Sequence, residues 1–214
     1  MGQTETVHHL DFIIGLFAMM NPLAAIPMLL AVTVGFSGAG RRLTVLAAFV
    51  GMLVILLGAQ YSGVLLLDTL GTSLASFQIA GGLVIAWSGF TMLRDVQHEP
   101  ERPTDARKAS PIELGIVPLA IPLLAGPGAI TKVLLEAQDG FGLDSPFHIS
   151  LNIAITCAAA ALVLLLAGGI GKLVGAAGLI IFNRVFGLIV IAIGVEIVFG
   201  GVQGHIAALA SGGG

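Results

Sequence analysis

Two proline-containing stretches inside apolar segments could hold a ligand through backbone groups. The first is Asn21-Pro22, in a run that is otherwise apolar enough to lie in a bilayer. Proline removes a backbone donor and clashes with the preceding turn, and Asn-Pro is also typical of a helix start, with Asn as N-cap. We therefore expect a helix that stops and restarts here. The second stretch is Gly126-Pro127-Gly128, in a later run that also contains Pro118 and Pro122.

The chemistry expected of such a break is the binding of a small anionic group. A restarted helix presents unpaired N–H groups and the positive end of its dipole. Irregular backbone is tolerated at membrane depth only against protein or a water-filled cavity, so the breaks should line a site. Two such ends that meet near the midplane would suit a carboxylate. The alternative is a proline kink without a ligand.

Polar and small side chains near the breaks complete the predicted site. Gln78 and Asn183 could bond across helices or coordinate the substrate, and Thr131 could reach a ligand or bond back to its own helix. The small side chains around the breaks leave room only for a small ligand. The predicted substrate-binding residues are Asn21, Pro22, Leu23, Ala24, Gln78, Gly126, Pro127, Gly128, Thr131 and Asn183.

Three ionisable side chains fall inside predicted membrane spans, where charge is costly and usually paired or functional. Lys132 and Glu196 should lie at a similar depth, so we expect an ion pair between them, with proton coupling through Glu196 as the alternative. Arg184 could extend its charge to the lipid headgroups, or it could face the cavity and attract anions.

No residue set predicts catalysis, a metal site or a cofactor. Trp87-Ser88-Gly89 resembles a serine nucleophile, but no histidine is predicted at membrane depth to act as its base. The histidines of the predicted outer side lack a metal-ligand spacing. Phosphate-binding loops and nucleic-acid-binding patches are also missing from the sequence. We expect a protein that is not an enzyme, has no cofactor and binds no nucleic acid.

The composition predicts a helical protein with several membrane spans. Of the 214 residues, 57% are hydrophobic and only 10% are charged, and the mean hydropathy is +1.03. A soluble domain has about a quarter charged residues. The thirty glycines suit close helix packing in lipid and allow a homo-oligomer.

Six segments are long enough to cross a bilayer, and all basic residues except Lys132 lie on one side of them. That side should be cytoplasmic, which places both termini outside and the protein in the cell inner membrane. The first ten residues contain no Lys or Arg, so a cleavable secretory signal is not expected. The predicted spans are Leu10–Val34, Leu43–Leu67, Gly71–Leu93, Ile112–Ala137, Phe147–Gly169 and Gly178–Gly201.

The two halves of the chain repeat at an offset of 105 positions, and we call residues related by this offset counterparts. Rare features keep the offset without a gap. The counterpart pairs include Pro22 with Pro127, Asn21 with Gly126, Ala24 with Ala129, Gln78 with Asn183, Gly82 with Gly187 and Gly89 with Gly194.

Each half holds three predicted spans, and three is odd, so the second half must enter from the opposite side. This inverted pattern is typical of secondary transporters. The predicted fold is all-α: a polytopic membrane protein of six transmembrane helices in two inverted three-helix repeats, with helices 1 and 4 broken. The repeats cover residues 1–93 and 112–214, and a polar cytoplasmic loop covers residues 94–111.

The stretches 17–27 (FAMMNPLAAIP) and 118–131 (PLAIPLLAGPGAIT) resemble two signature stretches of the MarC family of bacterial and archaeal membrane proteins. The resemblance extends over nearly the whole chain. It implies a membrane protein similar to transporters of small neutral amino acids such as glycine and alanine. Family members more often have glycine where this chain has Ala24, which narrows the space beside the first break.

The sequence therefore predicts a secondary transporter for small neutral amino acids or similar zwitterionic metabolites, in contact with the lipid bilayer. Asn21 and the amides that follow Pro22 and Pro127 would hold the carboxylate. The alternatives are a non-transporting membrane protein with an assembly or stress-response role, and a passive channel.

Overall fold

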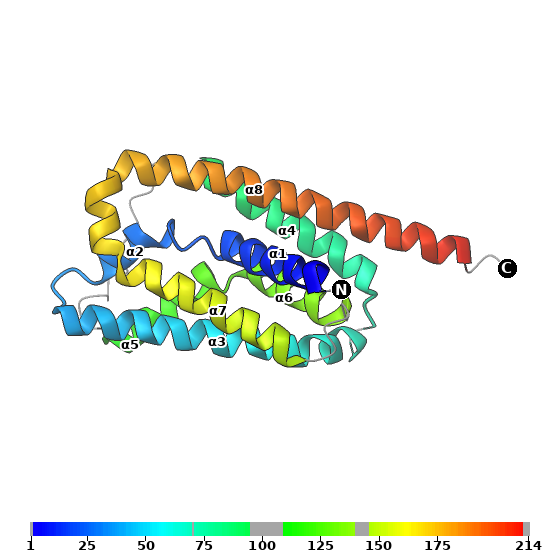
Figure 1. The fold of residues 1–214 in the computed structure, drawn as a ribbon, viewed down its shortest axis with the longest axis horizontal. Coiled ribbons are helices and arrows are strands. Elements are labelled where there is room, and N and C mark those ends of the chain that lie inside the picture. The colour runs from blue at the N-terminus through cyan, green and yellow to red at the C-terminus, as the bar shows by residue number, and fades with distance from the viewer. Residues whose placement is uncertain (1, 70, 95–108, 140–145, 212–214) are drawn as a thin grey trace.

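The computed structural model describes residues 2–69, 71–94, 109–139 and 146–211, and these residues form helices and no strands. Figure 1 shows the helices running roughly along one direction, with α8 lying along α4. The elements are α1 (Gly2–Met20), α2 (Ala25–Val32), α3 (Gly38–Thr69), α4 (Leu74–Arg94), α5 (Pro111–Leu114), η1 (Gly115–Leu124), α6 (Pro127–Asp139), α7 (Pro146–Leu165) and α8 (Ala167–Ser211).

Four of these helices contain stretches that are long and apolar enough to cross a membrane: Gly38–Gly63, Ala75–Arg94, Pro146–Leu165 and Ile180–Ile206. Two further pairs are bent at short breaks, by 50° between α1 and α2 and by 66° between η1 and α6. The described chain thus has four candidate spans, or up to six if each bent pair counts as one. Both bends lie at the stretches where the sequence predicts breaks.

At the first break, Asn21 ends a helix and does not start one, so the expected N-cap role is wrong. Asn21 has a φ of +42°, in the left-handed region that asparagine enters more readily than most residues. Its N–H still bonds to Phe17 O (3.0 Å), and its backbone O and side-chain Oδ1 both accept from Ala24 N–H (3.0 and 3.4 Å). A turn follows, and α2 begins at Ala25.

The second break is longer because three prolines act in succession. Val117 and Ile121 have extended backbone angles inside η1, and each precedes a proline, which disfavours helical angles in the residue before it. The chain then restarts as α6 at Pro127, a residue well suited to the first helical position. The first bond of this helix runs from Ile130 N–H to Gly126 O (3.1 Å).

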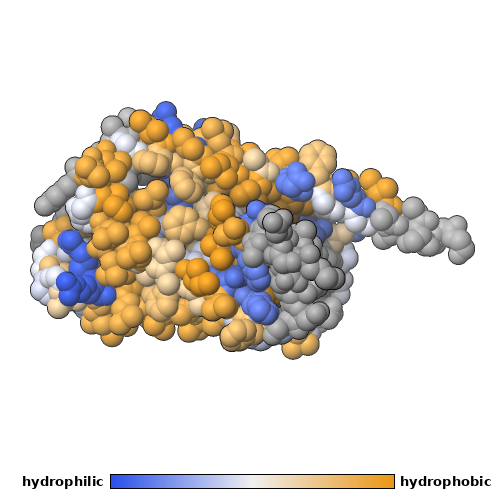
Figure 2. Space-filling model, in the orientation of Figure 1, coloured by the Kyte–Doolittle hydropathy of each residue, from blue (hydrophilic) through white to orange (hydrophobic). Residues whose placement is uncertain are grey.

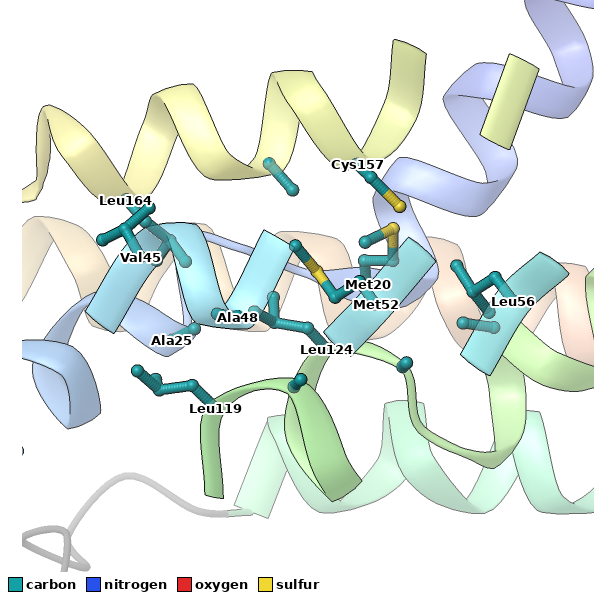
Figure 3. Close-up of a cluster of buried hydrophobic side chains, with 14 of the residues drawn as sticks. Met20, Ala25, Val45, Ala48, Met52, Leu56, Leu119, Leu124, Cys157 and Leu164 are labelled. Atoms are coloured by element: carbon teal, nitrogen blue, oxygen red, sulfur yellow. The ribbon is translucent and has the colours of Figure 1, made fainter. Parts of the chain in front are cut away.

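The main core lies between the first break, the second break and the helices α3 and α7. Its fully buried side chains come from all of these elements, and Figure 3 shows Met20, Met52 and Cys157 among them. A second, smaller cluster contains Met19, Ile85, Val190, Met92, Ile193 and Ile197, from α1, α4 and α8.

The outer surface is largely apolar, as a membrane protein requires. Figure 2 shows hydrophobic residues over most of the visible face and hydrophilic residues mainly toward its two ends. Large exposed hydrophobic side chains include Val54, Leu65, Trp87, Leu162 and Leu188. Because water would penalise so much exposed apolar area, this surface fits a hydrocarbon environment.

Helices α4 and α8 form a close antiparallel pair along a row of glycines. A Cβ added at Gly82 would lie 2.6 Å from Gly194 O, and one added at Gly89 would lie 2.6 Å from Gly187 O. These distances leave no space for a side chain. α8 itself turns sharply at Gly175, where φ is +67°, before its membrane-spanning part begins.

The predicted polar loop, residues 94–111, lies mostly outside the described residues. Where it rejoins the described chain, Ser110 caps α5 by accepting from Glu113 N–H (3.3 Å) while Ser110 N–H donates to the Glu113 carboxylate (2.7 Å). This reciprocal capping box fixes the start of the second half of the chain.

Candidate functional site

A cavity of about 300 Å³ lies between the two breaks, α4 and α8. The first break contributes its turn, the second break contributes the start of α6, and the two long helices close the sides. Predicted substrate-binding residues that line the cavity are Asn21, Ala24, Gly126, Pro127, Gly128 and Asn183. The structure thus places both breaks at the same cavity, although they lie about a hundred residues apart in the sequence.

The other predicted substrate-binding residues lie away from this cavity. Pro22 is buried, and Leu23 packs against the main core. Gln78 is half-buried on α4 where Gly201 of α8 approaches it. Thr131 is buried against Gly81, because one turn of α6 carries its side chain past the cavity and into the contact with α4. Their role in substrate binding stays a prediction.

Two asparagines join the first break to α8 across the cavity. Asn21 Nδ2 donates to Asn183 Oδ1 (2.8 Å) and lies 3.6 Å from Met92 Sδ. Asn183 Nδ2 in turn donates to Met92 O (3.4 Å), near the end of α4. The three elements therefore meet through side-chain amides, and a ligand that competes for these amides would change how the elements are held together.

Backbone amides at the start of α6 give the cavity its positive end. Gly128 and Ala129 line the cavity and precede the first intrahelical bond of α6, so their N–H groups have no partner within the helix. At the first break, the N–H group of Ala24, which lines the cavity, already bonds to Asn21 O.

Sequence reasoning missed a polar strip of α4 in the cavity wall. Ser88, Thr91 and Met92 line the cavity, and Thr91 Oγ1 donates to Ser88 O (2.7 Å). Hydroxyl groups three residues apart on one face of an apolar helix were the available signal. Other lining residues that were not predicted are Met19, Met20, Ile85, Pro122, Leu123, Ala129 and Val190.

The expected ion pair between Lys132 and Glu196 is absent from the described residues. Lys132 Nζ lies 3.4 Å from Glu136 Oε2, one helical turn away, and 5.6 Å from the centre of the Phe12 ring. Glu196 is exposed on α8. The physical reason is packing, since α8 lies mainly against α4 while α6 lies against α1, α3 and α4.

No ionisable side chain is among the described residues that line the cavity. Arg184 is exposed beside Asn183 and is not part of the lining. No group of three or more His, Cys, Asp or Glu side chains in the described chain is arranged to hold a metal ion. The cavity is therefore uncharged in its side chains, with amide, hydroxyl and thioether groups and one helix N-terminus facing the space.

Comparison with known proteins gives consistent matches along the chain. The family described as "MarC family integral membrane protein" matches residues 6–206. The chain is 30% identical to the UPF0056 membrane protein YhcE of Escherichia coli (strain K12), covering 92% of each chain. It is 31% identical to the UPF0056 membrane protein MJ1677 of Methanocaldococcus jannaschii, covering 89% of this chain and 94% of that one.

A third relative is the UPF0056 inner membrane protein MarC of Citrobacter koseri, which is 32% identical over 87% of this chain and 90% of its own length. No solved structure matches the chain. The family match covers most of the sequence and both proline-rich breaks. The chain belongs to the MarC family of integral membrane proteins.

Proposed function

We propose that the protein is a secondary transporter for small neutral amino acids or similar small zwitterions, held in the cavity between the two breaks. One observation carries this proposal: a cavity without charged side chains borders the N-terminus of α6. The N–H groups of Gly128 and Ala129 there have no hydrogen-bond partner within the helix. A helix N-terminus favours a carboxylate by about 0.3–1 kcal/mol when exposed and up to about 2 when partly buried.

The remaining lining suits the other end of such a molecule. The side-chain oxygens of Asn21 and Asn183 can accept hydrogen bonds from an ammonium group without adding a net charge to the cavity. The volume is at the low end for ligand sites, which run from about 300 to 1,000 Å³, so a small molecule is favoured. The proposal assigns the protein neither catalysis nor a cofactor.

The proposal includes six spans arranged as two inverted repeats, in a cell inner membrane with both termini outside. Reciprocal glycine contacts support the repeat. Exchanging counterparts turns the contact of Gly82 with Gly194 into the contact of Gly187 with Gly89, and both contacts are present. A two-fold axis in the membrane plane would produce this exchange.

A thermal-unfolding screen of the purified protein against amino acids tests the proposal. A ligand at a hundred times its dissociation constant should stabilise the protein by about 2.7 kcal/mol. We expect stabilisation by glycine or alanine and none by large or charged amino acids. A protein with an assembly or stress-response role would show no amino-acid-dependent shift. Uptake that does not saturate and is not stimulated by exchange would instead indicate a channel.

Variants at the two breaks locate the site. We expect Asn21→Leu and Gly128→Leu to abolish amino acid uptake in vesicles while the proteins stay folded. Gly128 is chosen because a Cβ there meets only the Ile85 side chain, at 3.4 Å, whereas one at Gly126 would lie 2.6 Å from Pro122 O. Asn152→Leu is the matched control, because Asn152 is also a buried asparagine in an apolar helix but bonds to His9 outside the cavity (2.7 Å). Unchanged uptake in both break variants would remove the proposed site.

A further inference from the structure

The cavity is symmetric at its centre under the offset of 105 positions. Three counterpart pairs line it with both members: Asn21 with Gly126, Ala24 with Ala129, and Ile85 with Val190. These pairs come from the two breaks and from the middle of α4 and α8. A residue pair that lines the cavity with both members lies near the axis that would relate the two halves.

Away from this centre the cavity is one-sided. Ser88, Thr91, Met92 and Asn183 line it, and all four lie at the Arg94 end of the α4–α8 pair. Their counterparts are Ile193, Glu196, Ile197 and Gln78, and none of these lines the cavity. Along the α4–α8 pair, the cavity therefore extends from the central pairs toward the Arg94 end and not toward the opposite end.

On the opposite side, two of the counterparts pack against the smaller core cluster. Ile193 and Ile197 pack against the buried residues Met19, Ile85 and Val190 of the smaller core cluster. Gln78 lies half-buried where Gly201 approaches α4. Met92 packs against the same cluster and also lines the cavity, whereas Ile193 and Ile197 do not line it.

Among the four counterparts, Glu196 is the charged one, and its side chain is exposed. It is exposed on the stretch Ile180–Ile206, a candidate membrane span, and within the described residues it has no hydrogen-bond or ion-pair partner. A charged side chain at this depth is costly unless it meets water or a partner. Its counterpart Thr91 lines the open cavity.

We propose, on the basis of the transporter proposed above, that the chain has a second arrangement in which the cavity opens at the opposite face. In that arrangement the cavity is lined by the four counterparts in place of the residues that line it here. These counterparts are Gln78, Ile193, Glu196 and Ile197. The central pairs stay with the substrate in both arrangements. Glu196 then meets water, and an acidic group faces the substrate path from that side alone.

The glycine contacts allow α4 and α8 to move as one rigid unit in this change. Gly82 with Gly194 and Gly89 with Gly187 lie on opposite sides of the centre and are exchanged by the repeat. The pair can therefore stay packed while it tilts against the two breaks. Rocking of one packed unit around a fixed site is the usual means of alternating access.

Labelling of single cysteines from each side of the membrane tests the second arrangement. Cys157, the one cysteine of the chain, is first replaced by alanine. Ser88→Cys and Ile193→Cys are then treated with a membrane-impermeant maleimide, in right-side-out and in inside-out vesicles. We expect Ser88→Cys to react from the Arg94 face and Ile193→Cys to react from the opposite face.

The maleimide labelling rates can be predicted quantitatively. A minor state that holds about 1–10% of the molecules makes Ile193→Cys react about 10- to 100-fold more slowly than Ser88→Cys. Val195→Cys is the matched control on the same helix, because Val195 is exposed on the apolar outer surface and should stay unlabelled in lipid. Ile197→Cys, the counterpart of Met92, repeats the test if Ile193→Cys does not fold.

The possible results separate this inference from the transport proposal. If Ile193→Cys and Ile197→Cys react no faster than Val195→Cys from either side while uptake persists, the second arrangement is wrong and transport stands. If they react from the opposite face while no amino acid stabilises the protein, the second arrangement stands and the substrate class is wrong.

Discussion

Asn21 donates a 2.8 Å hydrogen bond to Asn183, and this contact links the first break of the chain to α8 across 162 positions of sequence. Asn21 is almost fully buried, and its amide also faces the thioether of Met92. The bond lies in the wall of the cavity, so the same atoms that hold the break against α8 are available to a ligand. Stability and binding should therefore be coupled at these two residues.

A double-mutant cycle should detect the coupling of Asn21 and Asn183. Asn21→Ala and Asn183→Ala each remove one partner and leave the other amide in the cavity wall. We expect the two losses in unfolding free energy to be non-additive, with a coupling of about 0.5–1.5 kcal/mol, the usual net value of one hydrogen bond. Unfolding in detergent without amino acids gives the four values. Strict additivity would mean that the two side chains do not interact.

Asn21 also has a backbone role that substitution can separate from its side chain. Its φ of +42° is tolerated by glycine but strained for alanine, at about 1–2 kcal/mol. Both Asn21→Gly and Asn21→Ala lose the bond to Asn183. We expect the glycine variant to be the more stable by about 1 kcal/mol in detergent unfolding. Equal stability of the two variants would argue against a left-handed turn at this residue.

The glycines of α8 should differ sharply in how well they tolerate substitution by alanine. A Cβ at Gly194 would lie 2.7 Å from Gly82 O and 2.6 Å from Ala86 N, whereas one at Gly200 meets no atom within 4 Å. We expect Gly194→Ala to lower the unfolding free energy by about 1–3 kcal/mol through overpacking. Gly200→Ala, on the same helix, should be neutral or slightly stabilising because alanine favours the helix.

The thermal midpoints of these two glycine variants provide the measurement. A similar midpoint for both would show that α4 and α8 are less closely packed than the glycine contacts indicate. Loss of stability in Gly194→Ala alone would support the close pair, on which the tilting of α4 and α8 depends.

The sequence predicted the parts of this structure that depend on local chemistry. Apolar runs of sufficient length predicted helices, and prolines at positions 22 and 127 predicted the bends that the structure has. The start of α6 at Pro127 follows from its fixed φ and missing N–H. The family was also recognisable, because the stretches 17–27 and 118–131 resemble family signatures and the family match covers both.

The parts that depend on packing between distant elements could not be predicted in the same way. Asn21 was expected to cap the following helix, but its left-handed backbone ends the preceding one. Its partner Asn183 was predicted for the site without the bond between them. Ser88 and Thr91 were missed because hydroxyl groups in a membrane helix commonly bond to their own backbone, as Thr91 does here.

The last prediction compares how removing the charge of Glu136 and of Glu196 changes the unfolding free energy. The Lys132–Glu136 pair has a 3.4 Å separation, and its side chains are only 24% and 12% exposed, so it should be worth more than the usual 0.3–0.5 kcal/mol of an exposed pair one turn apart. We expect Glu136→Gln to lower the unfolding free energy by up to about 1 kcal/mol.

Glu196→Gln should behave in the opposite way in the same unfolding measurement. Glu196 is exposed on a membrane span without an ion-pair partner in the described chain, so removing its charge should leave stability unchanged or raise it. The variant Lys132→Met serves as the common reference, because it should reduce the effect of Glu136→Gln and leave that of Glu196→Gln unchanged. If Lys132→Met instead cancels an effect of Glu196→Gln, then Lys132 pairs with Glu196 across helices in the membrane, as the sequence alone suggested.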